Sequence, residues 1–252
     1  MHEIALVGVG SAHPDHLTPA ARRALLEADL ILVPNKGSEK ADLAALRHAL
    51  LAGIGAGAAV AEFEMPARER EGADYLADVE DWHDRVAAAW AVPLQEKLPA
   101  GGRAALMIWG DPSLYDSSLR IAERLAGLGL QARIRVVPGL TSMQLLTAAH
   151  AIPLNALGAP VLVTTGRRLR EEGWPPGVDR AVVMLDGACS FRHLAEAERF
   201  HIWWGAYLGM AEEMLESGPL PVAGPRIEHE RAAARARHGW IMDVYLLERR
   251  PA

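Results

Sequence analysis

The sequence predicts an α/β fold of two domains, in which parallel strands are covered by helices. Short apolar runs rich in Val, Ile and Leu alternate with longer amphipathic segments, and several runs end in glycine or proline. Such runs are typical of strands buried on both faces, and their alternation with helices is typical of parallel sheets. The 252 residues, 50% hydrophobic and 23% charged, suffice for one or two cores and exclude a disordered chain.

The first half of the chain begins with an apolar run at residues 4–9 that leads into Gly10. A helix is expected from Thr18-Pro19 to about residue 29, because a Thr hydroxyl caps a first turn and Pro is tolerated at the first helical position. The same patterns predict strands at 30–33 and 104–108 and helices at about 39–51 and 74–97.

After residue 112 the pattern restarts, so the predicted domains are residues 1–112 and 113–252. The second half is richer in strands, and its helices are shorter. Its helices are expected at about 117–128, 141–150 and 211–216, and its strands at 134–137, 161–164, 181–185, 201–204 and 240–247.

The charge balance and the cysteine count limit the class of protein. With 32 acidic and 26 basic side chains the net charge is −6, which argues against a surface that coats nucleic acid but leaves room for a small basic pocket. No apolar run reaches the ~18 residues that span a bilayer, and the first ten residues resemble a strand more than a signal peptide. The single cysteine needs no oxidising compartment, so we expect a cytoplasmic protein with no membrane partner.

The turn Gly10-Ser11-Ala12-His13 follows the first strand and precedes a helix. Small residues there let a ligand approach the backbone, and the helix presents unpaired amides. A dinucleotide fingerprint would need glycine at position 13, so the nucleotide motif is incomplete. A tight turn without a ligand is the alternative interpretation.

Two further turns combine a strand end with polar residues. Trp109-Gly110-Asp111-Pro112 places a carboxylate at the carboxyl edge of the sheet, where open α/β sheets bind ligands, although Asp111 alternatively only caps a turn. Pro138-Gly139-Leu140-Thr141-Ser142 opens a helix with two hydroxyl residues, which either cap that helix or hold a ligand. Taken singly, none of the three turns identifies a function.

In this order and at these spacings, the three turns resemble the tetrapyrrole methylase family, the S-adenosylmethionine (SAM) methyltransferases of corrin and sirohaem synthesis. The likeness covers nearly the whole chain, and segments 35–43, 184–187 and 239–247 resemble one branch that acts in aerobic cobalamin synthesis. It implies two α/β domains with a cleft between them, where SAM binds largely through backbone. It also implies a homodimer, which apolar residues at helical spacing in 74–97 would fit as core or interface.

The resemblance implies a set of SAM contacts drawn from separate segments of the chain. They are Gly10, Ser11, Trp109, Gly110, Asp111, Leu114, Thr141, Ser142, Leu185 and Leu208. The first turn departs from the family's usual Gly-Pro-Gly-Asp, and Met184-Leu185-Asp186 stands where the family has Tyr-Met-Gly.

The reaction implied by the branch moves the SAM methyl to ring carbon C1 of precorrin-5, and the acyl unit at C20 leaves as acetate. The macrocycle supplies the nucleophilic carbon, so methyl transfer mainly requires near-attack positioning. Acyl removal requires attack on a ketone, which a carboxylate or imidazole assists. Asp111 and Asp186 are the catalytic candidates and His13 is a third, each with a structural role as the alternative.

Precorrins carry carboxylates, so an acidic protein must offer a local cationic rim. The candidates are Lys36 and Lys40 after the second strand, and Arg167 and Arg168 with Arg170 after the strand at 161–164. The alternative is that all five are solvated loop charges.

A metal site, a different methylation target and a binding module without turnover are the alternatives to this function. His13 and His16 share one turn but have no third partner there, so no metal site is expected. A relative that methylates RNA or protein should carry a contiguous basic face, which the charge balance disfavours. A nucleotide-binding module would retain SAM without turnover, and another tetrapyrrole methyltransferase would add the methyl group without removing the acyl group.

Overall fold

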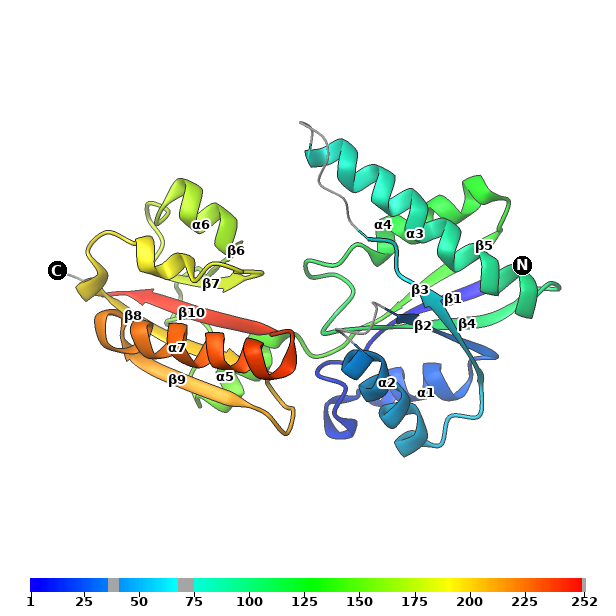
Figure 1. Ribbon diagram of the computed structural model, residues 1–252, viewed down its shortest axis with the longest axis horizontal. Helices are drawn as coiled ribbons and strands as arrows, with labels where there is room; N and C mark the ends of the chain where they lie inside the picture. Colours follow the sequence, from blue (N-terminus) through cyan, green and yellow to red (C-terminus); the bar gives the residue numbers. More distant parts are fainter. Residues whose placement is uncertain (36–40, 68–74, 251–252) are drawn as a thin grey trace. The chain divides into compact units, whose positions relative to one another are not determined.

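The first five strands form one parallel sheet in the computed structural model, which describes residues 1–35, 41–67 and 75–250. The sheet has the order β3-β2-β4-β1-β5, and all neighbouring strands run parallel (Figure 1). The strands are β1 (His2–Gly8), β2 (Leu30–Asn35), β3 (Ala59–Glu64), β4 (Gly102–Ile108) and β5 (Ala132–Val137).

Helices cover both faces of this sheet, which explains why its central strands are apolar on both sides. They are α1 (Pro19–Leu26), α2 (Ala41–Ile54), α3 (Tyr75–Lys97) and α4 (Ser118–Arg124), with 3-10 turns η1 (Pro14–His16) and η3 (Leu125–Leu128). Ile4 of β1 packs with Trp90 of α3, whereas Val7 packs with Leu25 of α1 on the opposite face. Each fully buried side chain of this size contributes about 1.5–3 kcal/mol of hydrophobic stabilisation.

The connections after β1 and β4 diverge to opposite faces of the sheet, although the two strands are neighbours. The chain after β1 continues into α1 on one face, and the chain after β4 continues into α4 on the other. In open α/β sheets, ligands bind beyond the carboxyl ends of neighbouring strands whose connections diverge in this way. The turns at Gly10 and Gly110 lie at this position.

The second sheet is mixed, not parallel as the sequence predicted, and has the order β6-β7-β10-β8-β9. Its strands are β6 (Leu162–Thr165), β7 (Arg180–Met184), β8 (Phe200–Ala206), β9 (Met214–Pro219) and β10 (Asp243–Arg249). β6 and β7 are parallel, β10 is antiparallel to β7 and β8, and β9 is antiparallel to β8. The short β8–β9 connection permits only antiparallel pairing, because a parallel crossover needs a longer segment.

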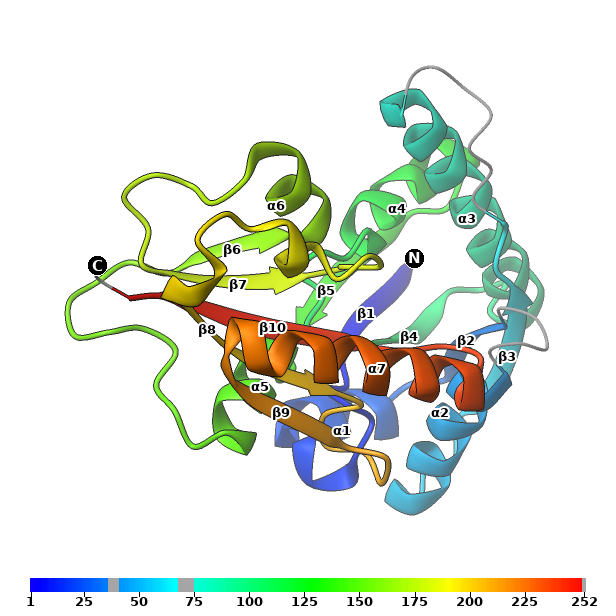
Figure 2. The same ribbon diagram turned by 60° about the vertical axis from the view of Figure 1, so that its left-hand side comes forward.

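Three helices and two 3-10 turns pack on this sheet. They are α5 (Ser142–Ala149), α6 (Gly166–Glu172), α7 (Leu220–His238), η4 (Ser190–His193) and η5 (Ala197–Arg199). Leu146 of α5 packs against Val182 and Leu246, and α7 lies over β8 and β9 (Figure 2). In the described parts of both units, no helix is long and apolar enough to cross a bilayer.

The sequence prediction was wrong at the segment before α7 and missed α7 itself. Residues 214–219 form the edge strand β9, where a short helix was predicted at 211–216. α7 contains two prolines, of which Pro221 lies in the first turn, where its missing N–H costs nothing, and Pro225 lies inside the helix. The helix then runs to a left-handed Gly239.

Two shorter elements were also missed. β3 alternates exposed and buried residues, with only Ala61 and Phe63 turned inward, so it lacks the continuous apolar run used to find strands. α6 has only seven residues and five of its side chains are charged, so its sequence shows little helical periodicity of apolar residues.

The boundary predicted near residue 112 lies inside the first compact unit, which extends from Met1 to Thr141. The reason is β5, which pairs with β1 from His2 to Val7 and completes the first sheet. The second unit is Ser142–Ala252.

Candidate functional site

A pair of backbone hydrogen bonds joins the turn after β1 to the turn after β4. The Gly10 N–H donates to the Gly110 carbonyl at 3.2 Å, and the Gly110 N–H donates to the Gly10 carbonyl at 2.8 Å. Both residues have positive φ angles, +58° and +66°, which glycine adopts without strain. The two glycines noted in the sequence therefore make one bridged double turn.

The turn after β5 approaches this double turn at backbone contact distance. A Cβ on Gly8 would lie 2.6 Å from the Gly139 nitrogen and 2.8 Å from the Gly110 oxygen, so no side chain fits there. The Thr18 hydroxyl, which also caps α1, donates to the Pro138 carbonyl at 3.3 Å. The structure thus brings together the predicted turns at Gly10, Gly110 and Gly139.

Asp111 ties the second of these turns to the third. Its Oδ2 accepts from the Gly139 N–H at 2.9 Å, and its Oδ1 accepts from the Ser113 N–H at 2.8 Å and from the Ser113 hydroxyl. Burial raises the pKa of Asp111, but the hydrogen bonds from Ser113 and Gly139 outweigh it and hold the pKa below its usual value. Asp111 is therefore an ionised cap and cross-link between turns.

The polar side chains of the first turn form a hydrogen-bonded pair. Ser11 Oγ lies 2.8 Å from His16 Nδ1, and Ser11 is only 6% exposed. The neighbouring His13 has a different contact, since its Nδ1 accepts from the Asp15 N–H at 3.2 Å and caps η1. Sequence reasoning considered His16 only as a metal ligand and did not find its pairing with Ser11.

Arg47 is a second residue that sequence reasoning missed. It is 3% exposed on α2, and its guanidinium lies 4.8 Å from the centre of the Trp109 ring. Its Nη1 donates to the Leu43 carbonyl at 3.1 Å, whereas Nε has no hydrogen-bond partner among the described residues. Burial lowers the pKa of Arg47 to about 10, which still leaves a positive charge beside Trp109. The sequence signal for Arg47 is a cationic residue at a position that belongs to the apolar face of α2.

In the second unit, two residues that directly follow strands adopt left-handed backbone. Leu185 after β7 and Tyr207 after β8 have φ of +53° and +51°. Both strands are antiparallel to β10, so these ends lie at the same edge of the second sheet. Leu185 is 66% exposed, whereas Leu208 packs in the core with Leu146. A cofactor contact at Leu208 would therefore involve its backbone.

Asp186 is surrounded by hydrogen-bond donors. Oδ2 accepts from the Tyr245 hydroxyl and the Ser190 N–H, each at 2.6 Å, and Oδ1 accepts from the Ser190 hydroxyl at 2.8 Å and the Ala188 N–H at 3.1 Å. Burial raises the pKa of Asp186, but these bonds, led by Tyr245, leave it below the usual value. Its carboxylate anchors the turn that begins at Leu185, and a catalytic role stays a prediction.

The predicted arginine rim begins beside Asp186. Gly166, the first residue of α6, packs directly on the Asp186 side chain, so Arg167 and Arg168 follow at that point. Both arginines are exposed, and Arg168 makes two hydrogen bonds of 3.0 Å to Glu172. Lys36 and Lys40 lie outside the described residues.

The remaining predicted contacts lie close to these turns. The Leu114 N–H donates to the Asp111 carbonyl at 3.2 Å. Thr141 ends the first unit and Ser142 begins α5, so the third turn leads directly into the second unit.

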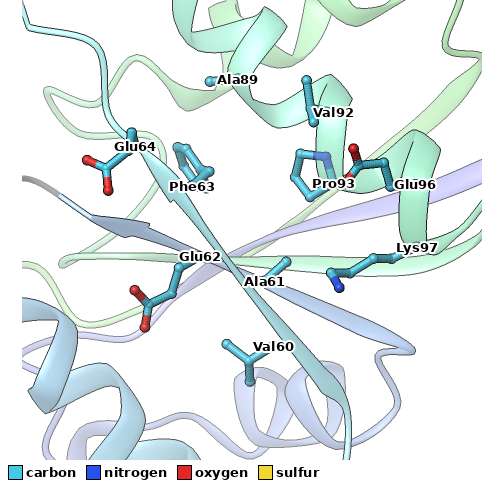
Figure 3. Close-up of a pocket in the computed structure, with 10 residues that line it drawn as sticks. All are labelled: Val60, Ala61, Glu62, Phe63, Glu64, Ala89, Val92, Pro93, Glu96 and Lys97. Atoms are coloured by element: carbon cyan, nitrogen blue, oxygen red, sulfur yellow. The ribbon is translucent and has the colours of Figure 1, made fainter.

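A pocket of about 530 Å³ lies elsewhere in the first unit, between the edge strand β3 and α3 (Figure 3). Its charged lining consists of Glu62, Glu64, Glu96 and Lys97, and no predicted site residue belongs to it. Three carboxylates against one ammonium group would repel an anionic ligand, so we assign this pocket no part in the predicted chemistry.

Comparison with known proteins extends along nearly the whole chain. The family Tetrapyrrole (Corrin/Porphyrin) Methylases matches residues 3–223. The chain is 43% identical over 252 residues to a "Precorrin-6A synthase [deacetylating]" of Sinorhizobium sp, a match that covers 99% of this chain and 96% of that protein.

Two solved structures have related folds. A cobalamin synthesis related protein (CobF) of Corynebacterium diphtheriae is 36% identical, with a TM-score of 0.85 and full coverage of both chains. A uroporphyrin-III C-methyltransferase of Thermus thermophilus, complexed with S-adenosylhomocysteine, is 20% identical with a TM-score of 0.57, and the match covers 98% of this chain and 97% of that one. The second likeness shows a shared fold.

The glycine contact can be tested by adding one methyl group. Gly8→Ala should lower the free energy of unfolding by about 3 kcal/mol, because the new Cβ would overlap backbone that the sheet holds in place. Urea unfolding measures the change. The matched control is Gly53→Ala on α2, where a Cβ meets nothing within 4 Å. The higher helix propensity of alanine should raise the free energy of unfolding of this variant by at most about 1 kcal/mol. Equal unfolding midpoints for both variants would refute the contact.

The ionised state of Asp111 can be tested by Asp111→Asn. In the asparagine side chain an NH2 group replaces one acceptor oxygen, which leaves the backbone N–H of Gly139 or Ser113 unpaired. The free energy of unfolding should therefore fall by about 1–3 kcal/mol near neutral pH. Because the folded pKa is lowered, the stability from Asp111 is present above its unfolded pKa and is lost as pH falls through its folded pKa. Urea unfolding of both proteins should therefore give a difference that shrinks in acid, and a pH-independent difference would contradict the assignment.

Proposed function

The chain belongs to the tetrapyrrole (corrin/porphyrin) methylase family and is a SAM-dependent methyltransferase, and from this premise we propose that it methylates precorrin-5 at C1 and releases acetate to give precorrin-6A. The observation that supports the specific reaction most strongly is full-length similarity to a protein named for it. The bridged turns of the first unit support the same proposal, because they offer a backbone-lined edge at the sheet's divergence point.

The residues at this edge fit SAM. A Cβ on Gly110 would meet only the Leu140 carbonyl, at 3.9 Å, so the backbone there faces open space. We place SAM against Gly10, Ser11, Trp109, Gly110 and Asp111, with further contacts from Leu114, Thr141, Ser142, Leu185 and Leu208. When bound, SAM supplies an electrophilic methyl group on a cationic sulfonium.

The protein's part in methyl transfer is positioning. The macrocycle brings the nucleophilic carbon, so the transfer needs no nucleophile or base from the chain. Turns fixed at backbone contact through Gly8 and Gly139 hold bound groups with little freedom. The ionised Asp111 adds a fixed negative charge that favours a nearby cation.

We propose that the tetrapyrrole carboxylates meet the cationic rim predicted from the sequence. Arg167 and Arg168 supply bidentate guanidinium groups at the start of α6, and Lys36 and Lys40 belong to the same proposal. We further propose a cytoplasmic homodimer as the working form, on the strength of the family resemblance.

The test of the function is incubation of the purified protein with SAM and enzymatically prepared precorrin-5. Mass spectrometry should find a product that has gained one methyl and lost one acetyl group, with one S-adenosylhomocysteine formed for each acetate. Methyl gain alone would assign the chain to a different reaction of the family.

The cationic rim can be tested by a double variant, Arg167→Ala with Arg168→Ala. The KM for the tetrapyrrole should rise about five- to tenfold, because two exposed charge contacts are each worth up to about 1 kcal/mol, while the KM for SAM stays nearly constant. Steady-state kinetics with each substrate varied in turn measures both values. The control removes two exposed arginines from the end of α7, Arg235 and Arg237, and should change neither KM. An equal rise in both KM values would contradict the rim.

A further inference from the structure

The proposed reaction joins two chemically different steps, methyl transfer and acyl removal. Methyl transfer needs positioning, whereas acyl removal needs a nucleophile on a ketone and a group that moves a proton. Asp186 accepts four hydrogen bonds and Asp111 accepts three, so protonation of either carboxylate would weaken bonds that fix a turn. Another pair of groups suits the step better.

Ser11 and His16 have the geometry of an activated serine. The 2.8 Å between Ser11 Oγ and His16 Nδ1 lies within the range at which an imidazole accepts a hydroxyl proton. The hydroxyl is largely withdrawn from water, since Ser11 is 6% exposed, and the His16 ring lies 5.4 Å from the ring of His13. Removal from water strengthens such a hydrogen bond.

The pair also lies at the proposed site. Ser11 follows Gly10, whose backbone is bridged to Gly110. His16 packs on the other side of the same glycine, because a Cβ on Gly10 would lie 3.3 Å from the His16 Cβ. A group bound against the bridged turns would therefore be next to the Ser11 hydroxyl.

We propose that Ser11 and His16 are the catalytic residues of acyl removal, with Ser11 as nucleophile and His16 as base and then acid. This inference rests on the proposed function, because it assumes a substrate with an acyl group to lose. It assigns the two steps to separate groups, with Asp111 holding the turns and the Ser11–His16 pair acting on the ketone.

The step balances with water as the only co-reactant. His16 takes the Ser11 hydroxyl proton as the oxygen bonds to the acyl carbonyl carbon. The bond from that carbonyl carbon to the macrocycle breaks, and its electron pair goes to the ring carbon, which takes the proton from the imidazolium. Water, deprotonated by the same imidazole, then cleaves acetyl-Ser11 to acetate and restores the hydroxyl.

The experiment measures acetate and S-adenosylhomocysteine formed from precorrin-5 and SAM by the wild type, Ser11→Ala and His16→Gln. In the wild type the two products should appear in equal amounts. In both variants the ratio of acetate to S-adenosylhomocysteine should fall at least about a hundredfold, the size of a lost general base, and a methylated, still acylated tetrapyrrole should accumulate. The control is Asp15→Asn, an exposed side chain of the same turn, which should keep the wild-type ratio.

Calorimetric titration with S-adenosylhomocysteine accompanies the assay and should show unchanged binding in His16→Gln, because His16 is not among the proposed SAM contacts. Equal amounts of acetate and S-adenosylhomocysteine from the variants, at whatever rate, would overturn the role of the pair. Loss of binding in both variants would show that the pair is structural and would overturn it as well. A wild type that forms neither product would instead remove the proposed function, and with it the inference.

Discussion

The contact of three stretches of backbone at Gly8, Gly110 and Gly139 is the constraint on which the proposed ligand edge of the first unit depends. No side-chain atom fits between them, so the turns after β1, β4 and β5 are held together by the sheet itself. Strand pairing therefore sets the positions of the amides and carbonyls that line these turns, and the Asp111 side chain adds a cross-link between two of them. An edge of this kind suits a ligand recognised mainly through main-chain contacts.

Buried carboxylates then fix the turns, in the same way in both units. Asp111 joins the turn after β4 to the turn after β5, and Asp186 anchors the turn after β7. In each case amide and hydroxyl donors outweigh the cost of burial and keep the carboxylate ionised. Arg47 differs, because within the described part of the chain its buried charge faces the Trp109 ring and a backbone carbonyl and no carboxylate.

These contacts distinguish the carboxylates that fix the turns from the Ser11–His16 pair that we propose for acyl removal. Groups that already hold the backbone are poor choices for proton transfer, since each proton moved would disrupt a turn. The Ser11–His16 hydrogen bond joins two residues of one turn, whereas the Asp111–Gly139 bond joins two turns. Proton transfer by Ser11 and His16 would therefore leave the bonds between the turns in place. Precise positioning of a large, flat substrate requires such a fixed set of turns.

The sequence by itself predicted the alternation of strands and helices in most of the first unit and the three turns that form its proposed ligand edge. Apolar runs that lead into Gly10 and Gly110 carry that information locally, because buried strands and left-handed turns each demand particular residue types. The same local signals were weak for β3 and α7, where alternation was partial or prolines intervened.

Only the tertiary structure decided that β5 belongs to the first sheet, that Tyr245 donates to Asp186, and that Arg47 lies beside Trp109. The Tyr245–Asp186 pair is 59 positions apart in the sequence. Residue type and spacing encode what the backbone prefers locally, whereas the partner of a distant side chain depends on which strands pair, and that is settled by the whole core at once.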